Sequence, residues 1–317
     1  MIRVFIKYKE EIGITTSKFN QKYKICYLNG KRGLKKNYYF PGDATAIDRI
    51  KSQLIKKVTN EHSERFCLGI GGLDKEGALI TYGVNSKYGY IDTTGTASGI
   101  NSTKVIKKAL QEQIEKNELM NFWYTDRCEK YLIRLDNKYN NLIKECNFIA
   151  DSIIVFAFRS LSNNFTVLSL SFKDRQLTGC GINLSEQIGV SINNAILENK
   201  IIEWQNYRNP FSTFYKKCVE LEHLVYDEIC MKKQDNELDI NSLERILETK
   251  LLNEDSILYY SDIVLLGNTN SSLKTIKVLS KFLLNCVPTQ SNMKKSKSQG
   301  ILKGIDFENH RLDCIIV

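Results

Sequence analysis

The sequence predicts an α+β fold, and two observations support this. Short apolar runs of strand type alternate with polar turns in both halves of the chain, and longer segments show the three-to-four-residue spacing of amphipathic helices. The chain has 317 residues, of which 42% are hydrophobic and 26% are charged. This composition is typical of a folded protein and excludes a disordered or collagen-like chain. We expect one domain over residues 1–317, with the weakest pattern in about the first 40 and the last 30 residues.

The first half combines strand-like runs with two helical patterns. The strand-like runs cover residues 3–8, 23–28, 66–70 and 78–83, and the helical patterns cover 45–65 and 102–120. The second half opens with two apolar runs, 153–158 and 166–172, which predict paired strands across a turn at 162–164. Helical patterns follow at 186–205, 213–232 and 240–252, and the last strand-like segments are 263–266 and 282–287.

Charge, cysteines and hydropathy exclude several classes of protein. The net charge of +9 is spread along the chain apart from Lys294, Lys295 and Lys297, which we interpret as a solvated loop rather than a nucleic-acid site. The nine cysteines are scattered and form no CxxC pair, so reduced thiols are expected rather than disulfides or zinc ligands. The chain lacks an apolar run of about 18 residues and a signal-peptide pattern, so we expect a cytoplasmic protein without membrane contact.

A carboxylate occupies the position where the first helix should continue its apolar face. That face consists of Ile47, Ile50, Leu54 and Val58. The next step in the spacing falls on Glu61, and Glu64 lies about one turn further on the same side. A buried carboxylate without a partner is costly, so this position indicates a cation or an arginine opposite Glu61. The alternative, which the pattern leaves open, is that the helix ends near Asn60.

Two further helices carry glutamates at the edges of their apolar faces. In the helix over 102–120, Glu112 lies at the edge of the apolar arc and Glu115 lies next to it on the outer side. Asn101 or Ser102 is the expected N-cap of this helix. Glu198 lies at the edge of the helix over 186–205, which follows a glycine-containing turn at 179–184. Hard cations such as Mg²⁺ take carboxylate oxygens together with phosphates and waters. Glutamates from three helices facing one cleft would therefore suit a nucleotide bound through Mg²⁺.

These motifs resemble those of the YcaO superfamily. The segment TTGTASG at 93–99, followed by ALQEQIEK at 109–116, is similar to the family's S-x-G-x-A-x-G turn and its A-L-x-E-x-x-E-R helix. The string EHSER at 61–65 resembles an earlier family helix that ends in E-x-x-E-R. The segment 179–181, followed by 191–198, resembles a later G-x-G turn and helix. The resemblance covers the chain from about residue 40 onward.

The resemblance implies a YcaO-like fold in which strands pack with several long helices around a nucleotide cleft. It also implies ATP and Mg²⁺ as cofactors, held by Glu61, Glu64, Glu112, Glu115 and Glu198, with Thr94 near the phosphates. Members of the family activate a peptide amide: a Cys, Ser or Thr side chain adds to its carbon, and its oxygen is phosphorylated by ATP and leaves as phosphate. An azoline-forming cyclodehydratase, or a relative with another nucleophile, is the implied activity, and no catalytic residue is assigned.

Two functions stay open at this point. The first is an ATP- and Mg²⁺-dependent enzyme that modifies a ribosomally made precursor peptide, with a separate protein that recognises the leader. The second is a degenerate relative that serves as a scaffold or binding subunit. The retained glutamates favour the first. The second is favoured by the lack of a lysine at 42–44, by Ile201 in place of the family's usual Gln, and by the lack of a proline-rich tail. The sequence leaves open the substrate, the nucleophile (thiol, hydroxyl or external sulfur) and the oligomeric state, a homodimer included.

Overall fold

The computed structural model describes most of the chain from residue 88 onward and five shorter stretches before it. The described residues are 12–18, 24–30, 38–42, 70–73, 79–82, 88–92, 94–99, 101–125, 127–208, 225–227, 229, 237–246, 261–266, 274–297, 300–310 and 312–314. The predicted strand at 3–8 and the predicted helix at 45–65, with Glu61 and Glu64, lie outside these residues. Of the predicted helix at 213–232, residues 225–227 and 229 are described and are helical.

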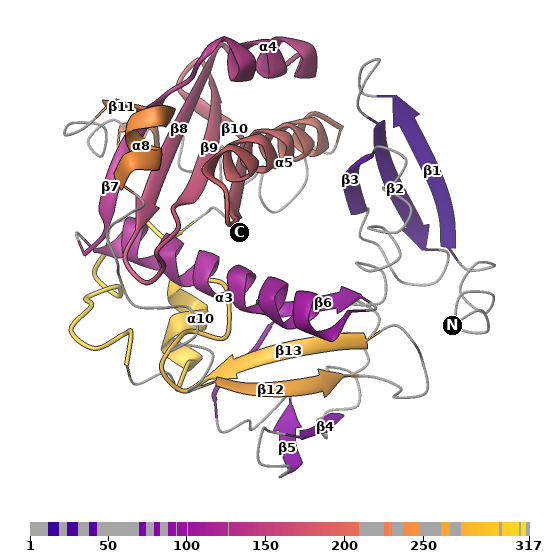
Figure 1. Cartoon of the computed structure of the whole chain (residues 1–317), viewed down its shortest axis with the longest axis vertical. Helices are drawn as coiled ribbons and strands as arrows, with labels where there is room; N and C mark the ends of the chain where they lie inside the picture. Colours follow the sequence, from indigo (N-terminus) through magenta and orange to yellow (C-terminus); the bar gives the residue numbers. More distant parts are fainter. Residues whose placement is uncertain are drawn as a thin grey trace.

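The described strands form four sheets, and all pairs but one are antiparallel (Figure 1). The early strands are β1 (Ile12–Lys18), β2 (Lys24–Gly30) and β3 (Tyr38–Gly42) in one sheet, and β4 (Ile70–Leu73) with β5 (Leu79–Tyr82) in another. A third sheet has the order β12 (Ser261–Leu266), β13 (Lys274–Ser280), β6 (Thr96–Gly99). The short segment 93–99, predicted as a turn, thus contributes a strand.

The largest sheet has five strands and contains the predicted strand pair. Its order is β10 (Gln176–Leu184), β9 (Thr166–Lys173), β8 (Ser152–Arg159), β7 (Glu129–Arg134), β11 (Glu237–Asp239), with β11 parallel to β7. The predicted pairing of β8 with β9 is confirmed, with Phe158 opposite Thr166. Both strands are buried on their two faces, which explains why they read as continuous apolar runs rather than as alternating ones.

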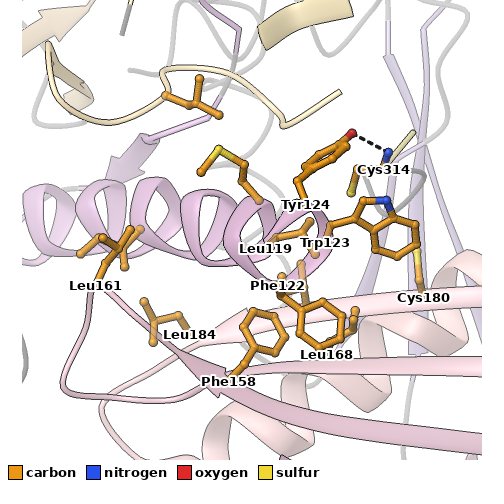
Figure 2. Packing of buried hydrophobic residues seen from close by; sticks show 14 of the residues in the cluster. Leu119, Phe122, Trp123, Tyr124, Phe158, Leu161, Leu168, Cys180, Leu184 and Cys314 are labelled. Atoms are coloured by element: carbon orange, nitrogen blue, oxygen red, sulfur yellow. Dashed lines mark hydrogen bonds between the residues drawn. The ribbon is translucent and has the colours of Figure 1, made fainter. Parts of the chain in front are cut away.

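A long helix, α3 (Ser102–Tyr124), lies between the five-stranded sheet and the β12-β13-β6 sheet (Figure 1). Asn101 is its N-cap and accepts a 3.0 Å hydrogen bond from the amide of Lys104, as expected from the sequence. On the side of the large sheet, Phe122 stacks on Phe158 with 4.4 Å between ring centroids (Figure 2). At the end of the helix, the Tyr124 hydroxyl accepts a 2.8 Å hydrogen bond from the amide of Cys314 (Figure 2). The helix therefore packs into the core over most of its circumference.

The opposite face of the large sheet is covered by α4 (Asn137–Cys146) and α5 (Ile188–Arg208). The sequence placed residues 179–184 in a turn before α5, and this was wrong: they belong to strand β10. The two glycines of that segment allow strand β10 and helix α5 to approach closely. A Cβ on Gly181 would lie 2.1 Å from the carbonyl oxygen of Ala195, so the strand and the helix backbone can approach only because the side chain is absent.

The predicted strand at 282–287 is also wrong, because these residues form a loop after β13. Their backbone groups are paired with side chains instead of with a neighbouring strand. Gln113 and Asn117 of α3 both donate to the carbonyl of Leu284, at 3.3 and 3.1 Å, and the Asn117 side chain also accepts from the amide of Leu284 at 2.8 Å. An apolar run can thus be buried without forming a strand when polar side chains satisfy its backbone.

The remaining described elements are short. They are α8 (Ile240–Ile246), which covers the start of the helix predicted at 240–252, and α10 (Gln290–Lys295). Lys294 and Lys295 belong to α10 rather than to the predicted loop, and both are exposed. Cys128, Cys146, Cys180, Cys286 and Cys314 are free thiols. In the same part of the chain, no helix is long and apolar enough to cross a bilayer.

Candidate functional site

Three of the six predicted site residues lie together around one lysine. Glu112 and Glu115 belong to α3, and Glu198 belongs to α5 on the other side of strand β10. All three carboxylates interact electrostatically with the ammonium of Lys116, whose Nζ lies 3.5 Å from Oε1 of Glu115. We call Glu112, Glu115 and Glu198 the glutamate cluster. Its members come from two helices that are far apart in the sequence and that meet at the same strand.

Strand β10 fixes two of these carboxylates through its backbone. Oε2 of Glu115 accepts a 3.0 Å hydrogen bond from the amide of Leu184, and Oε2 of Glu198 accepts one of 3.0 Å from the amide of Ile182. Among the described strands, β10 is at the edge of its sheet and pairs only with β9. Every second amide of an edge strand lacks a partner strand. The carboxylates of α3 and α5 satisfy two such amides and are thereby held in place.

Burial and repulsion between carboxylates raise the pKa of two members of the cluster, Glu115 and Glu198. Removal from water raises the pKa of Glu115 to about 8; the neighbouring Glu198 and Glu112 add to the shift, whereas Lys116 and the amide of Leu184 oppose it. Desolvation also raises the pKa of Glu198, but this residue keeps contact with solvent, so its shift carries less weight. For Lys116 the desolvation lowers the pKa, and the three carboxylates outweigh it and raise the pKa. The lysine therefore stays charged.

The donor set suits a cation that is shared with a ligand. Within the described residues, no three His, Cys, Asp or Glu side chains converge closely enough to enclose a metal ion. Mg²⁺ is usually bound by one or two carboxylates together with phosphate oxygens and water. Glu198 is solvent-exposed and Glu112 is half-buried, so a ligand can reach the cluster from solution. The residues present therefore fit Mg²⁺ held jointly with phosphates.

Thr94 does not join the glutamate cluster. Its amide donates a 2.8 Å hydrogen bond to Asp92, and its carbonyl accepts a hydrogen bond from Lys277. The adjacent Gly95 packs against Gln113 of α3. The Gln113 side chain points away from the helix in a direction about 200° around its axis from that of Glu115. Thr94 is buried, and within the described residues its hydroxyl has no hydrogen-bond partner. Its position near the phosphates stays a prediction.

A buried carboxylate one turn beyond the cluster was missed by the sequence reasoning. Glu118 is completely buried, and its Oε1 accepts hydrogen bonds from three successive amides, those of residues 160, 161 and 162, at 2.9, 2.7 and 3.0 Å. This carboxylate holds the loop between β8 and β9 against α3. The signal was present, because Glu112, Glu115 and Glu118 repeat at intervals of three. The third member was overlooked because the family motif ends at the second.

Comparison with known proteins identifies the fold. No protein-family model matches the sequence, and no curated protein is significantly similar to it. The YcaO protein of Methanopyrus kandleri, solved with AMPPCP and Mg²⁺ bound, superposes with a TM-score of 0.65 at 11% identity, over 93% of this chain and 92% of that chain. The chain has the YcaO fold.

Two other solved structures share this YcaO fold. A chain of the E. coli microcin synthetase McbBCD complex with pro-MccB17 bound has a TM-score of 0.63 at 12% identity, over 86% of this chain and 88% of that chain. A heterocyclase in complex with substrate and cofactor has a TM-score of 0.62 at 9% identity. The alignment covers 91% of this chain but about half, 52%, of that heterocyclase. The predicted YcaO-like α+β fold is thereby confirmed.

Proposed function

We propose that this chain is an ATP- and Mg²⁺-dependent enzyme that activates a backbone amide in a ribosomally made precursor peptide and converts Cys, Ser or Thr residues to azolines. The observation that carries the proposal is the glutamate cluster, because it gathers carboxylate oxygens from two helices at a position that solvent reaches. Solved structures with the same fold support it. One was bound with AMPPCP and Mg²⁺, one with pro-MccB17, and one with substrate and cofactor.

In this proposal, the chain's own residues position the reactants. Glu115 and Glu198 would hold Mg²⁺ with the carboxylate oxygens that accept no hydrogen bond from strand β10. Glu112 would supply the third carboxylate of the site. When bound, Mg²⁺ supplies charge neutralisation for the phosphates. Glu61, Glu64 and Thr94 are proposed to line the same site. The leader of the precursor would be bound by a separate protein.

The proposed reaction balances without a protein nucleophile. The peptide thiol or hydroxyl adds to the carbon of the preceding amide and gives up its proton. The amide oxygen takes the γ-phosphoryl group from ATP. The C–O bond then breaks with release of phosphate, and the amide nitrogen loses its proton and forms the C=N bond of the ring. The products are an azoline, ADP and phosphate. A rigid set of carboxylates suits such a reaction, because positioning and charge neutralisation supply most of the catalysis in phosphoryl transfer.

Calorimetric titration with a non-hydrolysable ATP analogue, with and without Mg²⁺, tests the nucleotide site. We expect Mg²⁺-dependent binding by the wild type, weakened about tenfold or more in Glu112→Gln. Glu244→Gln is the matched control, because Glu244 is exposed on α8 and outside the cluster. Absence of binding by the wild type, also with a candidate peptide and leader-binding protein added, would contradict the proposal.

A non-catalytic scaffold is the second candidate, and Lys116 is the observation that favours it. Its ammonium lies 3.5 Å from Glu115 and interacts electrostatically with Glu198 and Glu112, so it neutralises part of their charge without a metal ion. A degenerate site could keep its glutamates in this way after losing its nucleotide. The titration above separates the two candidates, because a scaffold would bind the partner protein or peptide but not the nucleotide.

A further inference from the structure

We infer that the Lys116 ammonium is a resident cation that competes with divalent metal for the carboxylates of Glu115 and Glu198. The inference rests on the proposed function in so far as it concerns the same site. It goes further in assigning a role to a residue of this chain that is not a metal ligand. Under this inference, the free site is neutralised internally, and a metal ion enters only when the lysine moves away.

The two carboxylate oxygens of Glu115 have different partners. Oε2 is held by the amide of Leu184 at 3.0 Å, so Oε1 is the oxygen that remains for a cation. That same Oε1 is the atom that faces Nζ of Lys116, at 3.5 Å. Since Mg²⁺ binds carboxylate oxygen at about 2.0–2.1 Å, a metal on Oε1 would have its double charge close to the ammonium. The two cations would therefore repel one another, so each weakens the binding of the other.

Glu198 extends the same competition to the second helix. Its Oε2 is bound by the amide of Ile182, and its carboxylate also interacts with Lys116. The Lys116 side chain is only 14% exposed and that of Glu115 only 11%, so solvent screens their attraction poorly. The lysine stem is flexible and reaches the carboxylates from the side of α3. Under the inference, rotation of this side chain releases the carboxylates when the metal ion binds.

The test is a titration with Mg²⁺ alone, without nucleotide, followed by calorimetry and by the thermal unfolding midpoint. In Lys116→Met we expect Mg²⁺ to bind at least about tenfold more tightly than in the wild type, because the competing charge is gone. We also expect a larger rise of the midpoint with Mg²⁺. Lys116→Arg keeps the charge and should behave like the wild type. Lys104→Met, exposed on the first turn of the same helix, controls for a change in net charge, and NaCl at equal ionic strength controls for screening.

Each outcome decides the inference. Unchanged Mg²⁺ affinity in Lys116→Met, or an equal gain in Lys104→Met, overturns it. If Lys116→Met fails to fold in metal-free buffer, its refolding yield is measured against Mg²⁺ concentration; rescue by Mg²⁺ but not by NaCl supports the inference, and absence of rescue overturns it. Failure of the proposed function is distinct, because it consists in the absence of nucleotide binding by the wild type and does not depend on the gain in Lys116→Met.

Discussion

The backbone amide of Leu184 donates a 3.0 Å hydrogen bond to the carboxylate of Glu115, which ties helix α3 to the edge of the large sheet. The amide of Ile182, two residues earlier on the same strand, does the same for Glu198 of α5. Two helices from different parts of the chain thus present their acidic side chains at neighbouring positions of one strand. This arrangement, rather than any local sequence pattern, assembles the glutamate cluster.

The raised pKa of Glu115 predicts a pH dependence of stability. With an ordinary pKa of 4.5 and a folded value of about 8, the folded protein holds more protons than the unfolded chain between these values. The free energy of unfolding should therefore fall as the pH rises through this range. In Glu115→Gln we expect a flatter profile, because the titrating group is replaced by a neutral one. Urea unfolding at a series of pH values measures it, and an unchanged slope in Glu115→Gln would assign the effect to other groups.

Replacement of Gly181 should separate strand β10 from helix α5. The new methyl group in Gly181→Ala would meet the carbonyl of Ala195 at 2.1 Å and the amide of Asn199 at 2.4 Å. Both are backbone atoms that cannot rotate away, so we expect a loss of about 3 kcal/mol in the free energy of unfolding. Nucleotide-analogue affinity should fall as well, because Glu198 would be displaced. Gly189→Ala, whose methyl meets only the end of the Tyr139 side chain, is the control and should be tolerated.

Loss of the Glu118 carboxylate should loosen the loop between β8 and β9. In Glu118→Ala, three backbone amides at 160–162 lose their acceptor in a buried environment, and we expect a cost of about 3–5 kcal/mol. Glu118→Gln keeps an acceptor oxygen and should cost clearly less. Hydrogen exchange at the amides of Leu161 and Ser162 reports on the site directly. Equal protection in the alanine variant and the wild type would contradict the assigned role.

The hydroxyl of Thr94 offers a test that separates binding from stability. Because this buried hydroxyl has no partner among the described residues, Thr94→Val should change the free energy of unfolding by no more than about 0.5–1 kcal/mol. If Thr94 contacts the phosphates, the affinity for the ATP analogue should fall about fivefold to tenfold. Thr96→Val is the matched control, since the Thr96 hydroxyl is also buried without a partner. A similar loss in both variants would indicate a general effect on this segment.

The parts of the fold that were predictable are those in which local pattern and tertiary environment agree. Strands β8 and β9 are continuous apolar runs because they are covered on both faces, and Ile192 and Ile196 mark the buried side of α5 by helical spacing. The loop at 282–287 was not predictable, because Gln113 and Asn117, far away in the sequence, provide its hydrogen bonds. Gly179 and Gly181 were interpreted as a turn. In the structure they allow strand β10 to approach helix α5 closely, and the local sequence does not indicate which helix lies there.

For the candidate site, the sequence predicted a group of glutamates but not its geometry, and the role of these residues as ligands stays a prediction. The repeated glutamates at the edges of apolar faces pointed to Glu112, Glu115 and Glu198, and the structure brings these three together. The spacing could not indicate that Lys116 lies among them, since a basic residue after two glutamates is common on exposed helices. The role of Thr94 near the phosphates was predicted from the resemblance alone. In the structure its backbone forms hydrogen bonds with Asp92 and Lys277. Glu61 and Glu64 lie outside the described residues.

The groups of Ile182 and Leu184 that hold Glu198 and Glu115 are main-chain amides. This determines which substitutions positions 182 and 184 can accept during evolution. A side-chain anchor is lost with one codon change, but an amide survives every substitution except proline. Positions 182 and 184 can therefore drift freely among residues that suit a buried strand while the acidic groups stay where they are. A scaffold anchored in this way can accumulate mutations until little of the original sequence is left.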